Sequence, residues 1–253
     1  MPLVRHRTLL VGARDGALLK LVEDLLRSVA HLDCEVRRVC IGLHWTAVES
    51  RFVGLAHTYK TSRKVEVADS GDLLGRSALE LAGRLRDWEP LEASLGLAAL
   101  NSLIEPSGSP GNVFDEVLRM APGRTVTVVG RFPFNDRLAD VAGRSYFLEM
   151  EPERGELPPW AAEDVIPRSD ISVISATALI NKTLPRLLEL GRGGTTIVLG
   201  PSTPLNDVLF EHGAVVLAGT RVSDPDRLLR CVTQGTKAFS RLAGLEPLVR
   251  RSR

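Results

Sequence analysis

The chain has 253 residues, of which 44% are hydrophobic and 25% are charged, and its formal net charge is +1. These values are typical of an ordinary soluble globular protein, and a net charge this close to zero argues against nucleic acid or an anionic membrane surface as a partner. No apolar run approaches the ~20 residues that span a bilayer. The first residues lack a signal-peptide core and cleavage site, so we predict a cytoplasmic protein.

The beginning of the chain predicts a helix followed by short strands. Residues 17–32 place leucine and valine at helical spacing, with Asp15 as a candidate N-cap. Residues 34–43, 45–53 and 54–59 are strand-like, the first with a break in its alternation. They follow one another too closely for crossover helices, so antiparallel pairing is expected.

Two helices are predicted next. The first carries an apolar stripe within residues 74–85, with Asp72 or Ser70 as a candidate cap. The second begins near Pro90, a residue suited to a first helical turn, and its stripe ends at Leu103. Helix, strands and two helices together indicate a small α+β unit.

A turn-rich segment, residues 105–112, separates this unit from the rest. It contains two prolines, two glycines and two serines, which makes it the best candidate domain boundary. We therefore predict an α+β domain over residues 1–107 and a second domain over residues 108–253.

The second domain predicts a parallel sheet. Short apolar strands recur along it: 126–129, 146–148, 171–174, 196–199 and 215–217. Helix-like segments separate most of them: 134–142, 184–190, 205–211 and 227–233. This alternation is typical of βαβ units in a Rossmann-like open α/β sheet, whose strand-to-helix loops share one edge where ligands bind. The arginine-rich end, residues 250–253, is interpreted as a frayed, solvated terminus.

The first two loops at that edge supply candidate ligand contacts. Gly130 permits close backbone approach, but Phe132 and Pro133 stand where a G-x-G-x-x-G cradle would continue, so ordinary NAD or FAD binding is disfavoured. The alternative for Gly130 is a plain tight turn. Glu149 or Glu151, after the second strand, could accept hydroxyls or bind an amine or a metal; a solvated carboxylate is the alternative.

The third loop, residues 175–183, is the most informative. Pro185 means that a straight helix starts no earlier than about residue 182, with Thr183 as N-cap. Asn181 and Lys182 then lie at the helix entrance, where N–H groups, the helix dipole and the ammonium would all favour an anion. The alternatives are an ordinary turn asparagine and a lysine that swings into water.

The later loops repeat this arrangement. Pro204 suits the first helical position with Thr203 as N-cap, which leaves the hydroxyl of Ser202 near a second helix entrance. Gly219 follows the fifth strand, and Asp224 is a helix cap without a ligand role.

Established reaction and metal motifs are missing from the sequence. There is no G-x-S-x-G elbow, Walker motif, H-E-x-x-H or paired-carboxylate pattern. The cysteines are few and form no C-x-x-C pair, and the five histidines share no ligand spacing, so neither a disulfide framework nor a zinc knuckle is indicated. We interpret Cys34, Cys40 and Cys231 as small hydrophobic residues.

Several segments carry a family resemblance, in the family's order and spacing: Val129-Gly-Arg-Phe-Pro133, Glu149-x-x-Pro152, Gly155-Glu-Leu-Pro158, Leu179-Ile-Asn-Lys-Thr183, Leu199-Gly-Pro-Ser-Thr-Pro204 and Leu217-Ala-Gly219. They resemble the Rossmann-like "putative heavy-metal chelation" domain family. Further segments resemble its common N-terminal partner, an enolase-N-like domain: Ile41–Val48, Gly54–Thr58 and Leu97–Leu103. The chain departs from the family pattern at Ser175-Ala-Thr-Ala178, where the family tends to have Thr-Gly-Thr-Thr, and at Glu156, where it tends to have Asp.

The resemblance implies a site between the two domains and a role in handling heavy metals or metal chelators. It adds Trp45, Thr46 and Asn101 to the candidate contacts. The predicted ligand-binding set is Gly130, Phe132, Pro133, Glu149, Thr177, Asn181, Lys182, Gly200, Ser202, Thr203, Gly219, Trp45 and Asn101.

Two functional hypotheses remain open. The first is a module that binds a small anionic or metal-chelating ligand in the interdomain crevice, with a heavy metal or metal chelate as the cofactor-like component. The second is an enzyme (a lyase, transferase or synthase) of metallophore or cofactor metabolism, with Lys182 as electrophile or base and Glu149 as its complement. The expected partner is a small molecule, and a homo-oligomer stays open.

Overall fold

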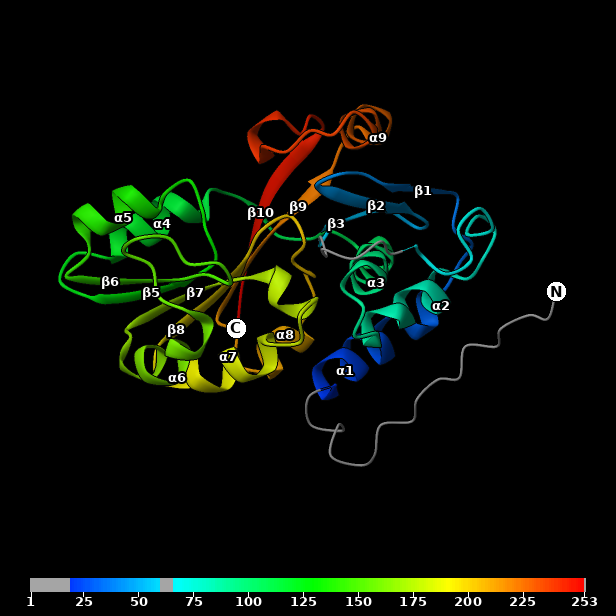
Figure 1. Ribbon diagram of the computed structural model, residues 1–253. Helices are drawn as coiled ribbons and strands as arrows, with labels where there is room; N and C mark the ends of the chain where they lie inside the picture. The colour runs from blue at the N-terminus through cyan, green and yellow to red at the C-terminus, as the bar shows by residue number, and fades with distance from the viewer. Residues whose placement is uncertain (1–18, 60–65, 253) are drawn as a thin grey trace.

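The computed structural model describes residues 19–59 and 66–252. A small α+β region built from the first part of the chain lies beside a larger α/β sheet built from the rest (Figure 1). The Asp15 cap proposed from sequence lies outside the described residues.

The N-terminal region has the element order that the sequence predicts. Its elements are α1 (Lys20–Val29), a 3₁₀ turn (Ala30–Leu32), β1 (Arg38–Ile41), β2 (Trp45–Glu49), β3 (Val53–His57), α2 (Ala78–Ala82), a second 3₁₀ turn (Gly83–Arg86) and α3 (Pro90–Leu103). The strands pair antiparallel in the order β1-β2-β3, which confirms the pairing expected from their short connections.

The cap predicted for the first of these helices is wrong. Helix α2 is capped by Ser77, whose Oγ accepts a hydrogen bond from the Glu80 N–H, so neither Asp72 nor Ser70 caps it. Helix α3 buries its predicted stripe and also most of its remaining surface. The close approach of β3 explains this: a Cβ added to Gly54 would lie 2.1 Å from the Ala98 carbonyl oxygen.

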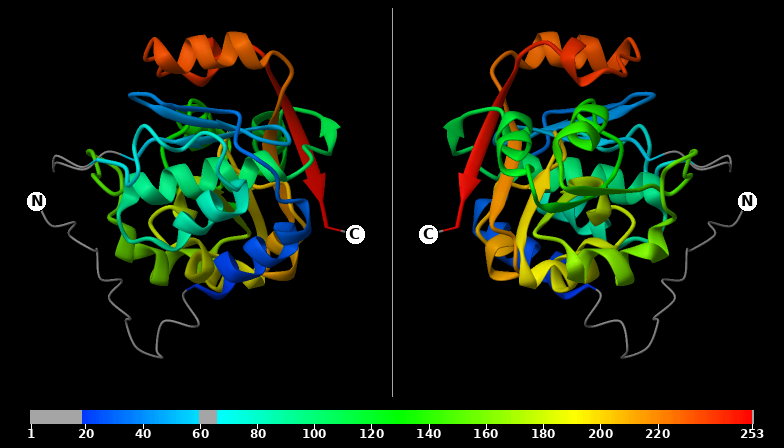
Figure 2. Two further views of the ribbon diagram at one scale, coloured as in Figure 1. Left: turned by 90° about the vertical axis from the view of Figure 1, so that its right-hand side faces the viewer. Right: turned by 90° about the vertical axis from the view of Figure 1, so that its left-hand side faces the viewer.

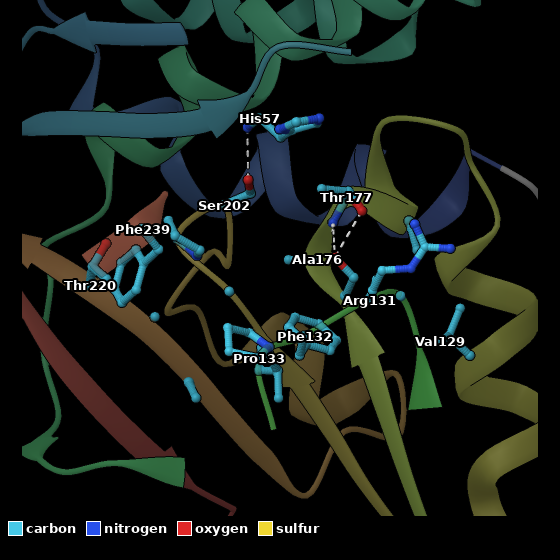
Figure 3. A pocket seen from close by; sticks show the side chains of 18 of the residues that line it. His57, Val129, Arg131, Phe132, Pro133, Ala176, Thr177, Ser202, Thr220 and Phe239 are labelled. Atoms are coloured by element: carbon cyan, nitrogen blue, oxygen red, sulfur yellow. Dashed lines mark hydrogen bonds between the residues drawn. The ribbon is translucent and has the colours of Figure 1, made fainter. Parts of the chain in front are cut away.

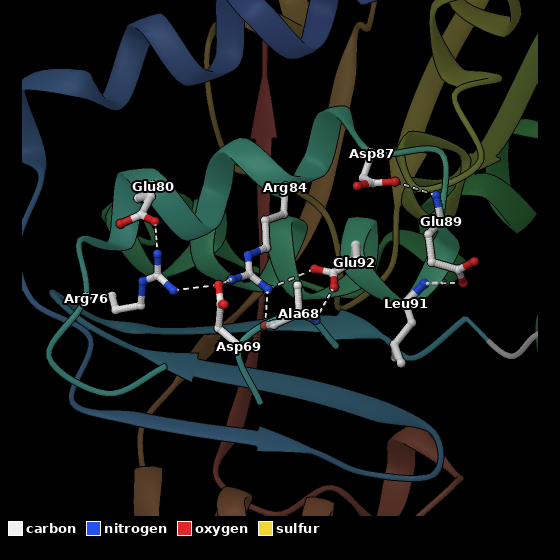
Figure 4. A network of polar contacts seen from close by, with 9 residues as sticks. All are labelled: Ala68, Asp69, Arg76, Glu80, Arg84, Asp87, Glu89, Leu91 and Glu92. Carbon is white, nitrogen blue, oxygen red and sulfur yellow. Dashed lines mark hydrogen bonds and ion pairs between the residues drawn. The ribbon is translucent and has the colours of Figure 1, made fainter. Parts of the chain in front are cut away.

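A polar network ties α2 and α3 to the segment that precedes them (Figure 4). Arg84 donates to the Glu92 carboxylate at 2.9 Å and to the Ala68 carbonyl at 2.8 Å, and Glu92 also accepts from the Ala68 N–H at 2.6 Å. Asp69 links Arg84 to Arg76 at the exposed end of the network. The nearly buried Glu92 is therefore fully paired, as a carboxylate in an apolar region must be.

Within the described residues, seven strands form the larger sheet in the order β4-β10-β9-β8-β7-β5-β6. The strands are β4 (Ser109–Pro110), β5 (Thr125–Val129), β6 (Arg144–Leu148), β7 (Ile171–Ser175), β8 (Thr195–Leu199), β9 (Val216–Val222) and β10 (Leu245–Arg251). The five strands from β5 to β9 are parallel, as predicted. Strands β4 and β10 are antiparallel additions, so the whole sheet is mixed.

The interpretation of the C-terminal arginines as a frayed end is therefore wrong. Arg250 and Arg251 belong to β10, which pairs with β9 along its whole length. The Arg250 guanidinium also donates to the Leu205 carbonyl at 2.6 Å, and Arg251 donates to Glu116 at 2.6 Å. Backbone pairing with a neighbouring strand orders this polar segment, and that pairing leaves little trace in its own sequence.

Helices cover both faces of the sheet (Figure 1). One face carries α4 (Val113–Met120), which the sequence analysis missed, and α5 (Asn135–Val141). The other carries α6 (Ala162–Val165), α7 (Leu184–Leu190) and α8 (Val208–Glu211). One apolar cluster fills the layer between the sheet and each set of helices. The cluster on the α6, α7 and α8 face extends into the N-terminal region through α1 and α3.

Helix α8 begins later than predicted. Asp207, not Thr203, is its N-cap residue, and residues 204–206 are not helical. The Asn206 side chain accepts from the Val208 N–H at 3.0 Å, which forms a local turn that competes with helix.

Helix α9 (Pro225–Thr233) leaves the large sheet and packs on β1 and β2 of the small one, on the side away from α3 (Figure 2). Asp224 caps it through a 3.0 Å hydrogen bond from the Arg227 N–H, as predicted. An apolar cluster holds it there: Trp45, Ala47, Leu55, Leu228, Val232 and Leu242. The small sheet is therefore covered on both faces. In residues 19–59 and 66–252, no helix is both long and apolar enough to cross a membrane.

Candidate functional site

The strand order places a switch point at β5. Strand β5 lies between β6 and β7, so the chain leaves it toward one side to form β6 and returns on the other side to form β7. The loops that follow β5 and β7 therefore diverge and leave a crevice at the carboxyl edge of the sheet, where open α/β sheets bind ligands.

A cavity of about 1410 Å³ occupies this edge. Loops that follow the parallel strands form one side of it, and Trp45 and His57 of the small sheet, with Tyr59 just beyond β3, form another. Most of the predicted site residues line it: Gly130, Phe132, Pro133, Glu149, Thr177, Asn181, Gly200, Ser202, Gly219 and Trp45. Lys182, Thr203 and Asn101 do not. Figure 3 shows Phe132 and Pro133 from the β5 loop on one side, with His57 and Ser202 on the opposite side.

The β5 loop presents backbone and aromatic surface to the cavity. Gly130 has φ +115°, a conformation that favours glycine, and its N–H donates to the Leu148 carbonyl. A Cβ at this position would lie 3.0 Å from the Ser175 Cβ and 3.3 Å from the Phe132 ring. The Phe132 ring belongs to a cluster with Phe114 and Phe134. The single glycine therefore serves close packing here, and the aromatic cluster makes a rigid wall.

Glu149 is the one carboxylate among the described residues that line the cavity. It lies directly after β6 and is half-buried, and this burial raises the pKa of its carboxyl group. The Met150 N–H donates to its Oε2 at 3.2 Å. The charge of the Arg131 guanidinium lowers the pKa of Glu149 and so opposes the effect of burial. The guanidinium itself forms a bidentate ion pair with Glu156, at 2.9 and 2.6 Å.

The β7 turn orders its own side chains. The hydroxyls of Ser175 and Thr177 are 2.8 Å apart. Asn181 Oδ1 accepts from both the N–H and the Oγ1 of Thr183, at 3.2 and 2.7 Å. Thr183 holds the predicted N-cap position of α7 but makes no side-chain cap bond, so the asparagine closes the turn.

Lys182 points away from the cavity. It is buried to 4% exposure with φ +64°, and its ammonium donates to the Ile180 carbonyl at 2.9 Å. Burial lowers the pKa of this amine to about 8, although Asp87 of the N-terminal region counteracts the effect. The sequence placed Lys182 correctly on the turn, but the direction of its side chain depends on which region packs behind that turn.

The β8 loop joins the two regions. Ser202 is buried, and its Oγ accepts from the His57 N–H at 2.9 Å. Its carbonyl accepts from Asn101 Nδ2 at 3.0 Å. Asn101 and Thr203 line a separate cavity of about 20 Å³. There Asn101 Oδ1 and Thr203 Oγ1 are buried without a hydrogen-bond partner in the described part of the chain.

Sequence reasoning missed the segment that follows α9. Residues 234–239 and Arg241 line the cavity, and the Trp45 indole donates to the Lys237 carbonyl at 3.2 Å. The side chains of Lys237 and Arg241 have no hydrogen-bond or ion-pair partner among the described residues. The segment has no periodicity, and its one signal was a glycine and a lysine directly beyond a helix end.

The lining does not suit a bare heavy-metal ion. Across residues 19–59 and 66–252, no three His, Cys, Asp or Glu side chains lie together as a metal-binding group. The three cysteines are free thiols, and none lines the cavity. Soft metals prefer thiolate ligands, so any metal in this crevice would need most of its ligands from another molecule.

The fold defines a two-part α/β protein with a cavity at the carboxyl edge of its larger sheet. Two family profiles, both described as "Putative heavy-metal chelation", match the chain: DUF364 over residues 112–244 and DUF4213 over residues 22–104. The chain belongs to this family. Among curated proteins, none matches it.

Two solved structures from the DUF364 family resemble the whole fold. A protein of unknown function from Desulfitobacterium hafniense DCB-2 is 28% identical, with a TM-score of 0.83 over 93% of this chain and 99% of that one. Another of unknown function, from Pyrococcus horikoshii, is 18% identical, with a TM-score of 0.78 over 93% of this chain and 100% of that one.

Proposed function

We propose that this protein binds a small anionic or metal-chelating molecule in the crevice between its small and large sheets. The observation that carries the proposal is the cavity itself, which lies at the carboxyl edge of the parallel strands and is lined by both regions. Crevices at this edge are where open α/β sheets hold their ligands.

The charges that line the cavity favour an anion. Arg131, Lys237 and Arg241 outnumber Glu149, the one carboxylate of the described lining. Arg131 is already neutralised by Glu156, whereas Lys237 and Arg241 are unpaired within the described residues. Two exposed, unpaired cations in the lining raise the local concentration of an anionic ligand and can pair with it directly.

A heavy metal would then enter as a chelate. The lining offers His57 and Glu149 as its side chains of metal-ligating type, which is too few for a closed protein site. Most metal chelators carry carboxylate or hydroxyl groups, so the complex can bind through the outer oxygens of the chelator. Binding of a metal as a chelate would explain why the family is described by heavy-metal chelation, although the described residues of this chain hold no cluster of metal ligands.

The enzyme hypothesis ranks second. The lowered pKa of Lys182 favours a reactive amine, since catalytic lysines are tuned in this way. However, the amine donates to Ile180 behind the turn, whereas Glu149 faces the cavity. A reaction that uses both groups would need the β7 turn to rearrange.

We further propose that the large region is Rossmann-like, the small region enolase-N-like and the protein cytoplasmic. The switch point between β5 and β7 supports a doubly wound sheet of the Rossmann-like class, in which the order β6-β5-β7-β8-β9 is the flavodoxin-like variant. The division into residues 1–107 and 108–253 stays a proposal, since one apolar cluster runs through both regions.

The proposal can be tested by native mass spectrometry and metal analysis of the purified protein, followed by titration calorimetry with citrate, iron(III) citrate and inorganic phosphate. We expect a retained anion, or binding of at least one probe that weakens about tenfold or more in a Lys237→Ala/Arg241→Ala variant. Arg230→Ala removes an exposed cation of α9 outside the cavity and should leave binding unchanged. A protein that retains no small molecule and binds none of the probes would contradict the proposal.

A further inference from the structure

We propose that Glu149 recognises a vicinal diol, carried next to a ring on the molecule that occupies the crevice. This inference rests on the proposed function and adds the chemical class of the ligand. It begins from the position of Glu149 directly after β6, beside the end of β5, because Leu148 is in register with Val129. In Rossmann dinucleotide-binding sheets an acidic residue at the end of the second strand accepts a ribose hydroxyl, and here too the second parallel strand, β6, lies directly beside the first, β5.

The chemistry of the carboxylate restricts its partner. An ionised carboxylate only accepts hydrogen bonds, so the ligand must donate. An amine would be an obvious donor, but Lys237 and Arg241 line the same cavity and repel a cationic group. Neutral hydroxyls remain. The backbone N–H groups of Met150 and Arg131 both interact with the carboxylate, whose two oxygens together offer about four acceptor sites, so sites remain for two adjacent hydroxyls.

The surroundings of Glu149 suit a ring attached to that diol. Phe132 and Pro133, on the neighbouring β5 loop, present apolar surface to the cavity (Figure 3). The Phe132 ring packs against Phe114 and Phe134, with ring centroids 6.2 and 5.9 Å away, and these contacts restrict its motion. A rigid aromatic face stacks well against a planar ring. The missing glycine-rich cradle argues against a pyrophosphate on the same molecule.

Two kinds of molecule combine a ring with a vicinal diol and fit this description. One is a ribonucleoside that carries an anionic group, such as a monophosphate, with the diol on its ribose. The other is a metal-free catechol, with the diol on the ring itself. A metal-loaded catecholate has lost both hydroxyl protons, so it cannot donate to Glu149 and is not included.

Matched ligand pairs test the inference by titration calorimetry at pH 8. One pair is adenosine 5′-monophosphate and 2′-deoxyadenosine 5′-monophosphate; the other is 2,3-dihydroxybenzoate and salicylate, which lacks one hydroxyl. We expect the diol member of one pair to bind at least about tenfold more tightly than its partner. That pair identifies the source of the diol. Glu149→Gln should abolish the preference, whereas Glu151→Gln, an exposed acid outside the cavity, should preserve it.

The outcomes separate this inference from the proposed function. Equal binding within both pairs, or a diol preference that survives Glu149→Gln, overturns the role of Glu149. Citrate, iron(III) citrate and phosphate are measured on the same samples, and circular dichroism checks that each variant is folded. If one of these anions still binds, the inference alone fails. If neither the anions nor the diols bind and no molecule is retained, the proposed function fails with it.

Discussion

Replacing Lys182 by methionine should change how the stability of the protein depends on pH. The lysine is 4% exposed, and burial lowers the pKa of its ammonium from an ordinary 10.5 to about 8. Methionine has a similar length and no charge, so it removes the titration and keeps most of the packing. The substitution also removes the hydrogen bond to the Ile180 carbonyl. While the lysine is protonated, this loss changes the free energy of unfolding by an amount that does not depend on pH.

The magnitude follows from the difference in pKa. A lowered folded-state pKa means that the unfolded chain binds more protons between about pH 8 and pH 10.5, so stability rises with pH across that window. Below pH 8 the buried charge costs about 3 kcal/mol, because each pKa unit corresponds to about 1.4 kcal/mol. Between pH 7 and pH 9.5 the wild type should therefore gain about 2 kcal/mol relative to Lys182→Met.

The assay is urea unfolding followed by circular dichroism at pH 7, 8, 9 and 9.5 for both proteins. All other titrating groups are shared, so they largely cancel in the difference between the two curves. Lys20→Met, at an exposed position of α1, is the control and should give a difference that does not change with pH. A difference for Lys182→Met that also stays constant within about 0.5 kcal/mol would refute the burial of this charge.

Two further substitutions test the buried polar groups. Glu92→Ala removes the carboxylate that pairs with Arg84 and leaves the Ala68 N–H without its acceptor in a nearly buried site, while Arg84 keeps Asp69 and the Ala68 carbonyl, so we expect a loss of about 2–3 kcal/mol in urea unfolding. Glu80→Ala, at the exposed end of the same network, should cost less than about 1 kcal/mol, and equal losses would contradict this ranking. Thr203→Val removes a buried hydroxyl that lacks a partner in the described part of the chain, so stability should stay constant or rise by about 1 kcal/mol. A loss above about 1 kcal/mol would show that the hydroxyl is hydrogen-bonded in solution.

Much of the candidate site could be predicted because the loops that follow parallel strands all lie at one edge of the sheet. The short apolar strands from Val126 to Leu217 revealed the βαβ order, and right-handed crossovers bring their following loops to one side. Gly130, Glu149, Asn181 and Gly200 could therefore be grouped from the order of the strands alone, and all four line the cavity.

The remaining site residues depended on long-range packing. Lys237 and Arg241 come after α9, and they reach the cavity only because α9 crosses to the small sheet. Lys182 and Thr203 lie on the predicted loops but turn away from the cavity. A loop position in sequence gives the location of the backbone, whereas the side of the loop that faces a ligand is decided by what packs against its back.

The sequence by itself therefore determined the local order of helices and strands, the parallel part of the sheet and the edge that carries the site, because hydrophobic periodicity and turn residues act over a few positions. Tertiary structure decided the antiparallel addition of β10, the burial of Lys182 and the contribution of the segment after α9. These features depend on contacts between residues far apart in the chain, such as Arg250 with Leu205 and Trp45 with Lys237, which no local pattern encodes.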